Sequence, residues 1–193
     1  MGREFELKYA ATPAAQQAIR DALGEGFQTI AMETTYYDSP DGAFNRLRWT
    51  LRRRTENGQS VCTVKIPLPD GSRGEWECHA ADIGDGIRAL IAMGAPKILA
   101  GLTINGVFPN CGARFTRLAA QIPTADGMAE LALDSGVLLG GGKEMPLCEV
   151  EIELKSGSET SAVALAQHLA AQYDLKEEPK SKFRRAMELA QGE

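Results

Sequence analysis

Acidic residues occupy every second position in two segments that lie far apart in the chain, with apolar residues between them. These acidic residues are Glu4, Glu6, Glu149, Glu151 and Glu153. Because successive side chains of a β-strand point to opposite faces, each segment would form a strand with one ionised face and one apolar face. Carboxylate oxygens gathered in this way can hold a hard divalent cation such as Mg²⁺ or Mn²⁺.

Basic residues alternate in the same manner elsewhere. Arg52 and Arg54 share one parity, Lys65 lies in the next extended segment, and Lys8 follows the first acidic pair. Planar guanidinium groups bind phosphate oxygens through two hydrogen bonds, and ammonium groups neutralise them as point charges. The combination predicts a site for a compact polyanion, several linked phosphates together with a divalent cation.

For any one of these strands alone, a solvent-exposed face is the simpler explanation, because antiparallel sheets often have one wet face. The whole set of strands favours an enclosed site. Exposed faces usually mix polar residues with charges of both signs, whereas each of these strands tends to carry one sign. Closing the strands into a barrel would turn the charged face inward and leave the apolar face for helices to cover.

The composition is that of one ordinary globular domain. The chain has 193 residues, 44% hydrophobic and 24% charged, which is enough for a sizeable core. A net charge of −5 argues against general attraction to nucleic acid or to an anionic membrane. The first residues are charged and no apolar run reaches the length of a membrane span. We therefore expect no signal peptide and a cytoplasmic location.

The cysteines and histidines give no indication of a zinc site. The cysteines have no CxxC spacing, and the histidines are His79 and His168 alone. We expect buried thiols in a reducing compartment, and we assign neither histidine a catalytic role.

Turn and cap signals divide the chain into strands and a few helices. Thr12, Pro13 and Gly24 predict a helix over residues 13–23. Asn57-Gly58 predicts a β-hairpin between residues 47–56 and 59–66. Further strands are expected over 26–37, 73–79, 113–122, 128–139 and 146–155, and further helices over 85–94, 158–175 and 180–190. This order predicts an α+β domain built on an antiparallel sheet.

Residues 4–8, EFELK, resemble the ExExK signature of the CYTH superfamily, also called the triphosphate tunnel metalloenzymes. Companion elements follow in the family's order: YYDSPDGAF, LRRR, TVK, EWE, LALDSG, CEVEIELKSG and SKFRRAMEL. The pattern is most similar to that of bacterial inorganic triphosphatases. Some of those proteins carry a helical CHAD domain after the CYTH domain. Nothing like it occurs in this sequence, so we expect a single CYTH domain over residues 1–193, either standing alone or cut from a longer protein.

The resemblance implies an eight-stranded antiparallel β-barrel with helices packed outside, forming a tunnel in which triphosphate binds. It implies that Mg²⁺ or Mn²⁺ is held by Glu4, Glu6, Glu149 and Glu151. It also implies that phosphate oxygens are bound by Lys8, Arg52, Arg54, Lys65, Arg114 and Lys182. Lys8 and Glu153 would act near the reacting phosphate or its water, and the tunnel would also be lined by Glu75, Glu77 and Asp134.

The sequence departs from the family's pattern at a few positions. The residues before Arg114 are not the polar ones that the family usually has, so Arg117 is a competing assignment. Thr50 stands where a small residue such as glycine is usual, and Ala186 replaces another usual glycine.

The expected activity is metal-dependent hydrolysis of inorganic triphosphate to diphosphate and phosphate. Two related activities stay open, a class IV type adenylate cyclase and a thiamine triphosphatase, and both need a surface for an organic group. Tyr36, Tyr37 and Trp49 could contribute to such a surface. A non-catalytic polyphosphate-binding module is less favoured, because it could do without the acidic residues. Nucleic-acid binding through residues 46–54 is disfavoured because that run contains one aromatic residue.

Overall fold

The structure is a computed structural model that describes residues 5–69 and 73–192. Its strands form one sheet in the order β5-β4-β3-β2-β6-β7-β8-β1-β9, and neighbouring strands are antiparallel. The strands are β1 (Glu6–Ala10), β2 (Gln28–Asp38), β3 (Thr50–Glu56), β4 (Gln59–Pro67), β5 (Arg73–His79), β6 (Phe108–Pro123), β7 (Met128–Gly140), β8 (Lys143–Ser156) and β9 (Lys176–Glu177). The helices are α1 (Pro13–Leu23), α2 (Ala43–Arg46), α3 (Ile83–Ala92), α4 (Ile98–Leu102), α5 (Glu159–Tyr173) and α6 (Lys182–Gln191).

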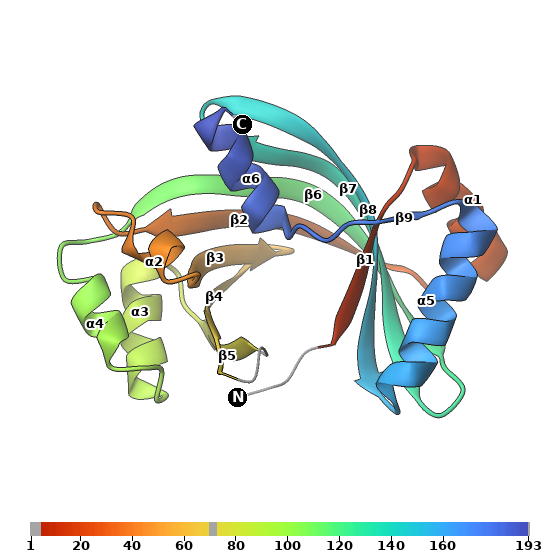
Figure 1. Cartoon of the computed structure of the whole chain (residues 1–193), viewed down its shortest axis with the longest axis horizontal. Coiled ribbons are helices and arrows are strands. Elements are labelled where there is room, and N and C mark those ends of the chain that lie inside the picture. Colours follow the sequence, from red (N-terminus) through yellow and green to blue (C-terminus); the bar gives the residue numbers. More distant parts are fainter. Residues whose placement is uncertain (1–4, 70–72, 193) are drawn as a thin grey trace.

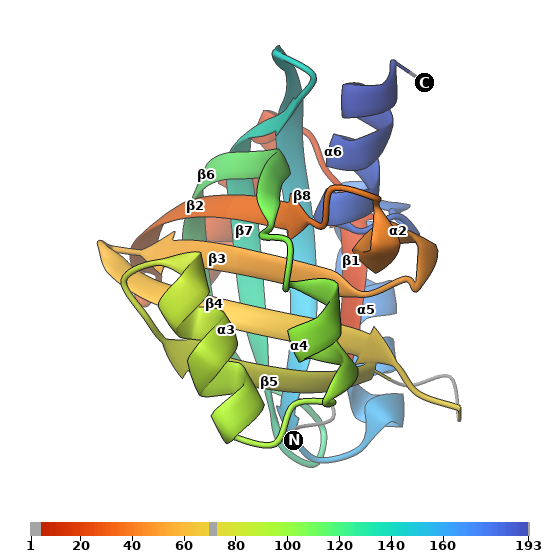
Figure 2. The same cartoon turned by 90° about the vertical axis from the view of Figure 1, so that its left-hand side faces the viewer.

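The sheet curves so strongly that β5 and β1, near its two ends, face each other across the concave side (Figure 1). Figure 2 shows β3, β4 and β5 crossing in front of β7 and β8. The predicted antiparallel α+β architecture is confirmed, but the closed eight-stranded barrel is not. Within the described residues the sheet ends at β5 and at β9, a ninth strand of 2 residues. No ladder in this part of the chain joins β1 to β5, because β1 pairs with β8 on one side and with β9 on the other.

Helices α1 and α5 cover the convex face of β1, β7 and β8. Ile19 of α1 and Leu169 of α5 belong to one buried cluster with Leu131, Val150 and Ile152 of the strands. Burying an aliphatic side chain of this size contributes about 1.5–3 kcal/mol. Because Val150 and Ile152 alternate with the acidic residues of β8, burial of the apolar face turns the carboxylates toward the concave side.

Helices α3 and α4 cover the convex face of β3, β4 and β5. Leu51 and Val64 of the strands are buried together with Leu90 of α3 and Leu99 of α4. The backbone of α3 approaches β4 so closely that a Cβ at Gly86 would lie 2.5 Å from the Cβ of Cys62. A residue with a side chain would push this helix away from the strand, so the close packing depends on glycine.

Helix α6 packs on the opposite, concave face. Its residues Ala186 and Met187 are buried in one cluster with Ala113 and Phe115 of β6. Ser181 caps the helix by accepting a hydrogen bond from the Arg184 backbone N–H at 3.1 Å. No helix in the described part of the chain, α6 included, is long and apolar enough to cross a membrane.

Local sequence signals account for most of these elements. Thr12 accepts a hydrogen bond from the Ala15 backbone N–H at 3.1 Å, as a helix N-cap does. Asn57 and Gly58 have φ values of 49° and 84°, the left-handed conformation that a two-residue hairpin turn requires. The segment from residue 84 to 111 contains two helices, α3 and α4, where the sequence predicted one.

A buried glutamine joins α1 to the backbone of β7 and β8. Gln16 Nε2 donates hydrogen bonds to the carbonyl oxygens of Asp134 at 3.0 Å and Glu149 at 2.7 Å. Its Oε1 accepts a hydrogen bond from Ser135 Oγ at 2.5 Å. Asp134 and Glu149 lie opposite each other in the β7–β8 ladder. The glutamine therefore fixes the backbone of the two residues whose carboxylates point to the concave side.

We predict that Gln16→Ala lowers the free energy of unfolding by about 2 kcal/mol or more, because it leaves buried polar groups without partners. Gln17→Ala is the matched control. Gln17 is exposed and bonds to Asp21 within the same helix at 2.7 Å, so its loss should cost less than about 0.5 kcal/mol. Urea denaturation measures both variants, and equal losses of stability would contradict the assigned role of Gln16.

Candidate active site

Antiparallel pairing brings charged residues of three strands to one place on the concave face. Lys8 of β1 lies opposite Glu151 of β8, and Asp134 of β7 lies opposite Glu149 of β8. Side chains of directly opposed residues project from the same face of a sheet. The alternation noticed in the sequence therefore produces a cluster in space.

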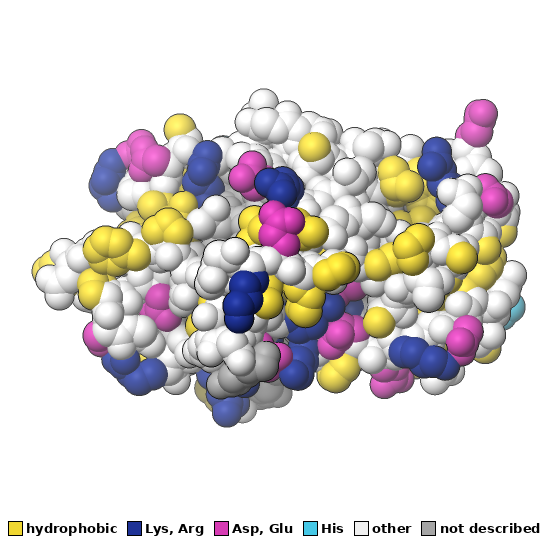
Figure 3. Space-filling view, turned by 90° about the horizontal axis from the view of Figure 1, so that it is seen from above, with side chains coloured by type: hydrophobic (Ala, Val, Ile, Leu, Met, Phe, Trp, Pro, Cys, Tyr) yellow, Lys and Arg dark blue, Asp and Glu magenta, His cyan; other side chains and the backbone are white. Residues whose placement is uncertain are grey.

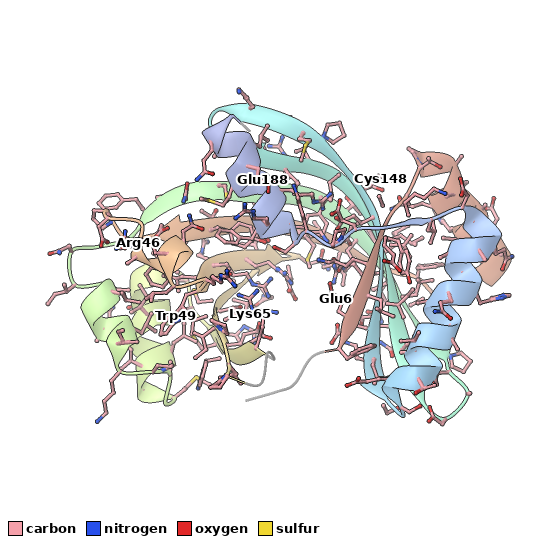
Figure 4. All side chains as sticks on the ribbon, viewed as in Figure 1. Glu6, Arg46, Trp49, Lys65, Cys148 and Glu188 are labelled. Atoms are coloured by element: carbon pink, nitrogen blue, oxygen red, sulfur yellow. The ribbon has the colours of Figure 1, made fainter. Side chains whose placement is uncertain are left out.

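The concave side holds a cavity of about 690 Å³ that is lined mainly by charged side chains. Its basic residues are Lys8, Arg52, Arg54, Lys65, Arg73, Arg117 and Lys182. Its acidic residues are Glu6, Glu75, Glu151, Glu153 and Glu159. Figure 4 shows Glu6 and Lys65 on opposite sides of this space. Seen from above, acidic and basic side chains are spread over the face of the molecule, and some of them lie near its middle (Figure 3).

Three carboxylates form what we call the carboxylate cage: Asp134, Glu149 and Glu151. They are 0%, 0% and 7% exposed, and one oxygen of each lies within 4.8 Å of the others. Three hard oxygen donors so close together suit a cation and repel one another without one. The sequence had assigned Glu149 and Glu151 to a metal and Asp134 to the tunnel lining, and the structure brings all three together.

Basic side chains surround the cage. Lys182 Nζ lies 2.8 Å from Asp134 Oδ2, 2.5 Å from Glu149 Oε2 and 2.5 Å from Glu151 Oε1. Arg117 binds both oxygens of Asp134 at 2.8 Å and also contacts Glu151. Arg185 of α6 contacts Glu149.

These ion pairs keep Glu151 charged at neutral pH. Burial by itself raises the pKa of Glu151, but Lys182 and Arg117 outweigh burial and hold the pKa at about 2. Burial likewise opposes the charge of Lys182, and Glu151 and Asp134 reverse that effect and raise its pKa. A buried ion pair of this kind is stable only while every partner is present.

Arg52 and Arg54 form the opposite wall of the cavity. Within residues 5–69 and 73–192, the ion-pair partner of Arg52 is Glu75, at 3.9 Å, and that of Arg54 is Glu56, at 3.3 Å. The buried Nε atoms of both arginines have no hydrogen-bond partner among the described residues. Burial and the neighbouring positive charge of Arg54 lower the pKa of Arg52. This wall therefore carries donors and positive charge that an anion would satisfy.

Several other predicted residues lie around the same cavity. Lys65 contacts Glu75 at 3.2 Å, and Glu153 lies opposite Glu6 in the β1–β8 ladder. Burial lowers the pKa of Lys8, whose Nζ lies 3.4 Å from the carbonyl oxygen of Lys180.

Glu77, predicted to line the tunnel, stands apart from this group. Glu77 accepts a hydrogen bond from Thr63 Oγ1 at 3.1 Å and does not belong to the cavity lining. Glu4, predicted as a metal ligand, lies outside the described residues.

Arg114, predicted to bind phosphate, does not line the cavity. Its side chain is 61% exposed and pairs with Glu144 at 3.2 Å, away from the cavity. Arg117 is 13% exposed and reaches both the cavity and the cage. The two arginines differ by an odd number of positions in one strand, so they must project from opposite faces of the sheet. The competing assignment, Arg117, is the one that faces inward.

The family model for the CYTH domain matches residues 2–187. The chain belongs to the CYTH domain family. An inorganic triphosphatase of Haemophilus influenzae is 26% identical over 194 residues, an alignment that covers 96% of this chain and 54% of the relative. The CYTH chain thus spans about half the length of that curated relative.

Solved structures show the same fold. A putative adenylyl cyclase of Hippeastrum, described as having a dominant triphosphatase activity, superposes with a TM-score of 0.67 at 20% identity over 93% of each chain. A putative adenylate cyclase of Bacillus halodurans gives a TM-score of 0.62 at 20% identity, over 94% of this chain and 96% of its own. At these identities the likeness concerns the fold of the CYTH domain and does not extend to the reaction.

Sequence reasoning missed two basic residues of this CYTH domain. Arg185 lies three positions after Lys182 in α6, and this helical spacing was a usable signal that both side chains share one face. Arg73 lines the cavity and has the parity of Glu75 in β5, so strand alternation could have found it.

The three aromatic residues considered for an organic substrate are not available to one. Trp49 and Tyr37 belong to the convex cluster beneath α3. Tyr36 reaches the cavity lining, but it is buried and its ring packs against Phe183 with centroids 4.9 Å apart. These residues provide no open stacking surface for a base or a thiazole ring.

We predict that Glu151→Gln removes part of the acid dependence of stability. The pKa of Glu151 is about 2 in the fold, below that of an unfolded glutamate, about 4.3. The ionised carboxylate therefore stabilises the fold at pH values above the pKa of the unfolded glutamate. This contribution is lost as the pH falls toward 2. Wild type should exceed the variant in stability near neutral pH, and the difference should shrink between about pH 5 and pH 2.

Urea denaturation at a series of pH values measures this difference. Glu144→Gln is the control, because Glu144 belongs to an exposed ion pair and its removal should change stability little at any of these pH values. A difference between wild type and Glu151→Gln that stays constant down to pH 2 would contradict the prediction.

Proposed function

We propose that this CYTH domain hydrolyses inorganic triphosphate to diphosphate and phosphate with the help of Mg²⁺ or Mn²⁺. The observation that carries the proposal is the division of one cavity between two walls. On one side, the buried Nε donors of Arg52 and Arg54 have no partner among the described residues. On the other side, Glu151 of the carboxylate cage lines the cavity. Family membership and a relative described as an inorganic triphosphatase support the choice of reaction.

In this proposal the basic wall binds the phosphate chain. Arg52 and Arg54 repel each other in a largely buried setting, and the negative charge of a bound triphosphate would offset that repulsion. Lys65, on the neighbouring strand β4, would neutralise further phosphate oxygens. Phosphoryl transfer needs little covalent help from the protein, so holding the chain in line and stabilising its charge accounts for most of the catalysis.

The carboxylate cage fits a hard divalent cation. It offers three oxygen donors from Asp134, Glu149 and Glu151, the ligand type that Mg²⁺ and Mn²⁺ prefer. Glu6 and Glu4 are proposed to complete the ligand set from the first strand. A bound ion would polarise the phosphate oxygens and lower the pKa of a coordinated water.

Lys8 and Glu153 are proposed to act at the reacting phosphate. Both line the cavity together with Glu6 and Glu151. Glu153 can orient the attacking water and accept its proton, as a carboxylate acting as general base does. Lys8, opposite Glu151 in the ladder, can stabilise charge that develops on the departing phosphate oxygens.

The cavity favours an inorganic substrate over an organic one. A cyclase must hold a nucleobase, and a thiamine triphosphatase must hold thiamine. The aromatic residues considered for that task are buried in the convex cluster or packed against Phe183. We also propose that the curved sheet acts as a tunnel, since strands near its two ends, β5 and β1, line the same cavity.

The alternative function, a non-catalytic polyphosphate-binding module, has less support than the triphosphatase activity. Such a module needs the basic wall but has no use for a cage of buried carboxylates, whose desolvation is costly. All three cage carboxylates are present here, and Glu151 lines the same cavity as Arg52 and Arg54.

We predict that Arg52→Ala and Arg54→Ala each lower kcat/KM for triphosphate by about 100-fold or more, since each removes charge-assisted hydrogen bonds to phosphate. Arg53→Ala is the matched control. Arg53 lies between them in β3 with the opposite parity and bonds to Ser60 Oγ at 2.9 Å. Its loss should change kcat/KM less than about threefold. Steady-state measurement of phosphate release gives kcat/KM for each variant. An equal loss of kcat/KM in all three variants would contradict the proposed basic wall.

A substrate panel tests the proposed reaction itself. Inorganic triphosphate, thiamine triphosphate and ATP are offered in turn with Mg²⁺ and with Mn²⁺, and released phosphate and cyclic AMP are measured together. We expect phosphate release from inorganic triphosphate to exceed that from the organic substrates, with no turnover in EDTA. Cyclic AMP as the main product, or full activity without a divalent cation, would overturn the proposal.

A further inference from the structure

The carboxylate cage holds the ammonium group of Lys182. The nitrogen lies between one oxygen of Asp134, one of Glu149 and one of Glu151, at 2.8, 2.5 and 2.5 Å. Lys182 is itself buried, and its nitrogen also lies 5.4 Å from the ring centroid of Phe115. The ammonium group thus has the position and the contacts of a small cation bound by three carboxylates.

A divalent cation held by the same oxygens would need the same space. Mg²⁺ sits about 2.0–2.1 Å from its oxygen ligands, and the cage oxygens lie within 4.8 Å of one another. An ion at their centre would overlap the nitrogen of Lys182. Two cations in direct contact inside a buried site would also repel each other strongly.

The charge balance leads to the same conclusion. The three carboxylates are matched by three basic side chains, Lys182, Arg117 and Arg185. Adding a divalent ion to this balanced cluster would leave two surplus positive charges in a buried place, a costly arrangement. Moving one ammonium group out halves that surplus. Arg117 is fixed by two hydrogen bonds from its planar guanidinium group to both oxygens of Asp134, whereas the ammonium group of Lys182 is a point charge on a flexible chain.

We propose that Lys182 and the divalent cation compete for the carboxylate cage, so that entry of the metal expels the Lys182 ammonium group into the cavity. The inference rests on the metal dependence in the proposed function, and adds that the metal-free enzyme carries its own substitute cation. The sequence predicted that Glu149 and Glu151 bind the metal and that Lys182 binds phosphate. In this proposal the two events follow each other: the metal binds the carboxylates first, and the released Lys182 then binds phosphate. Once expelled, the ammonium group faces the space where the phosphates bind.

Competition reduces the apparent metal affinity in proportion to the small fraction of molecules whose cage is free of Lys182. Lys182→Met keeps an unbranched apolar chain and removes the competing charge. Mn²⁺ binding to the substrate-free protein, followed by electron paramagnetic resonance, should be at least about tenfold tighter in this variant than in wild type. The control is Arg184→Met, which removes a positive charge from the exposed side of α6, where Arg184 pairs with Glu188 at 2.9 Å. Its Mn²⁺ affinity should stay within about threefold of wild type.

A second measurement uses wild-type protein and does not depend on the folding of a variant. Acetic anhydride acylates accessible lysine amines, and peptide mass spectrometry reads the rate at each lysine. Saturating Mg²⁺ without substrate should speed the acylation of Lys182 about tenfold or more. It should leave Lys176, whose side chain is 74% exposed, unchanged.

The competition is refuted if Lys182→Met binds Mn²⁺ no more tightly than wild type. It is also refuted if Mg²⁺ leaves Lys182 as protected as before. Either result leaves the proposed function standing if wild type still releases phosphate from triphosphate in a metal-dependent way. The proposed function fails separately, if that phosphate release is absent.

Discussion

The central constraint on this CYTH domain is that its ionised side chains face inward and must find opposite charges there. Because side chains alternate along a strand, Val150 and Ile152 point into the convex core and the neighbouring carboxylates point to the concave side. A carboxylate in such a place is stable only with a close positive partner. The arrangement of α6 and of the cavity both follow from that requirement.

Helix α6 meets much of the requirement on one wall. It is held on the concave face by Ala186 and Met187 in an apolar cluster, and its polar edge delivers Lys182 and Arg185 to the cage. Gln16 fixes the strands from the other side by bonding the backbone of two cage residues. On the far wall, the buried Nε atoms of Arg52 and Arg54 have no hydrogen-bond partner among the described residues. This difference between the two walls supports the proposal that an anion binds in the cavity with a cation beside it.

Much of this arrangement could be predicted from the sequence, because it depends on local patterns. Alternation in residues 149–153 was enough to separate the core face from the charged face, and Asn57-Gly58 was enough to place a hairpin. The choice between Arg114 and Arg117 was not decided by local pattern, since it depends on which face of β6 turns inward in the assembled sheet. The contact of Lys182 with the cage depends on where α6 docks, which is a property of tertiary packing. Barrel closure is likewise set by how the distant ends of the sheet meet, and no single strand encodes it.

The account as a whole holds that cation and polyanion bind together in the concave cavity. Anomalous diffraction from crystals grown with Mn²⁺ and a slowly hydrolysed triphosphate analogue tests this most directly. The account predicts a manganese signal at the carboxylate cage of Asp134, Glu149 and Glu151, and phosphate density against Arg52 and Arg54. Manganese outside the cavity, or an analogue bound away from both arginines, would contradict it.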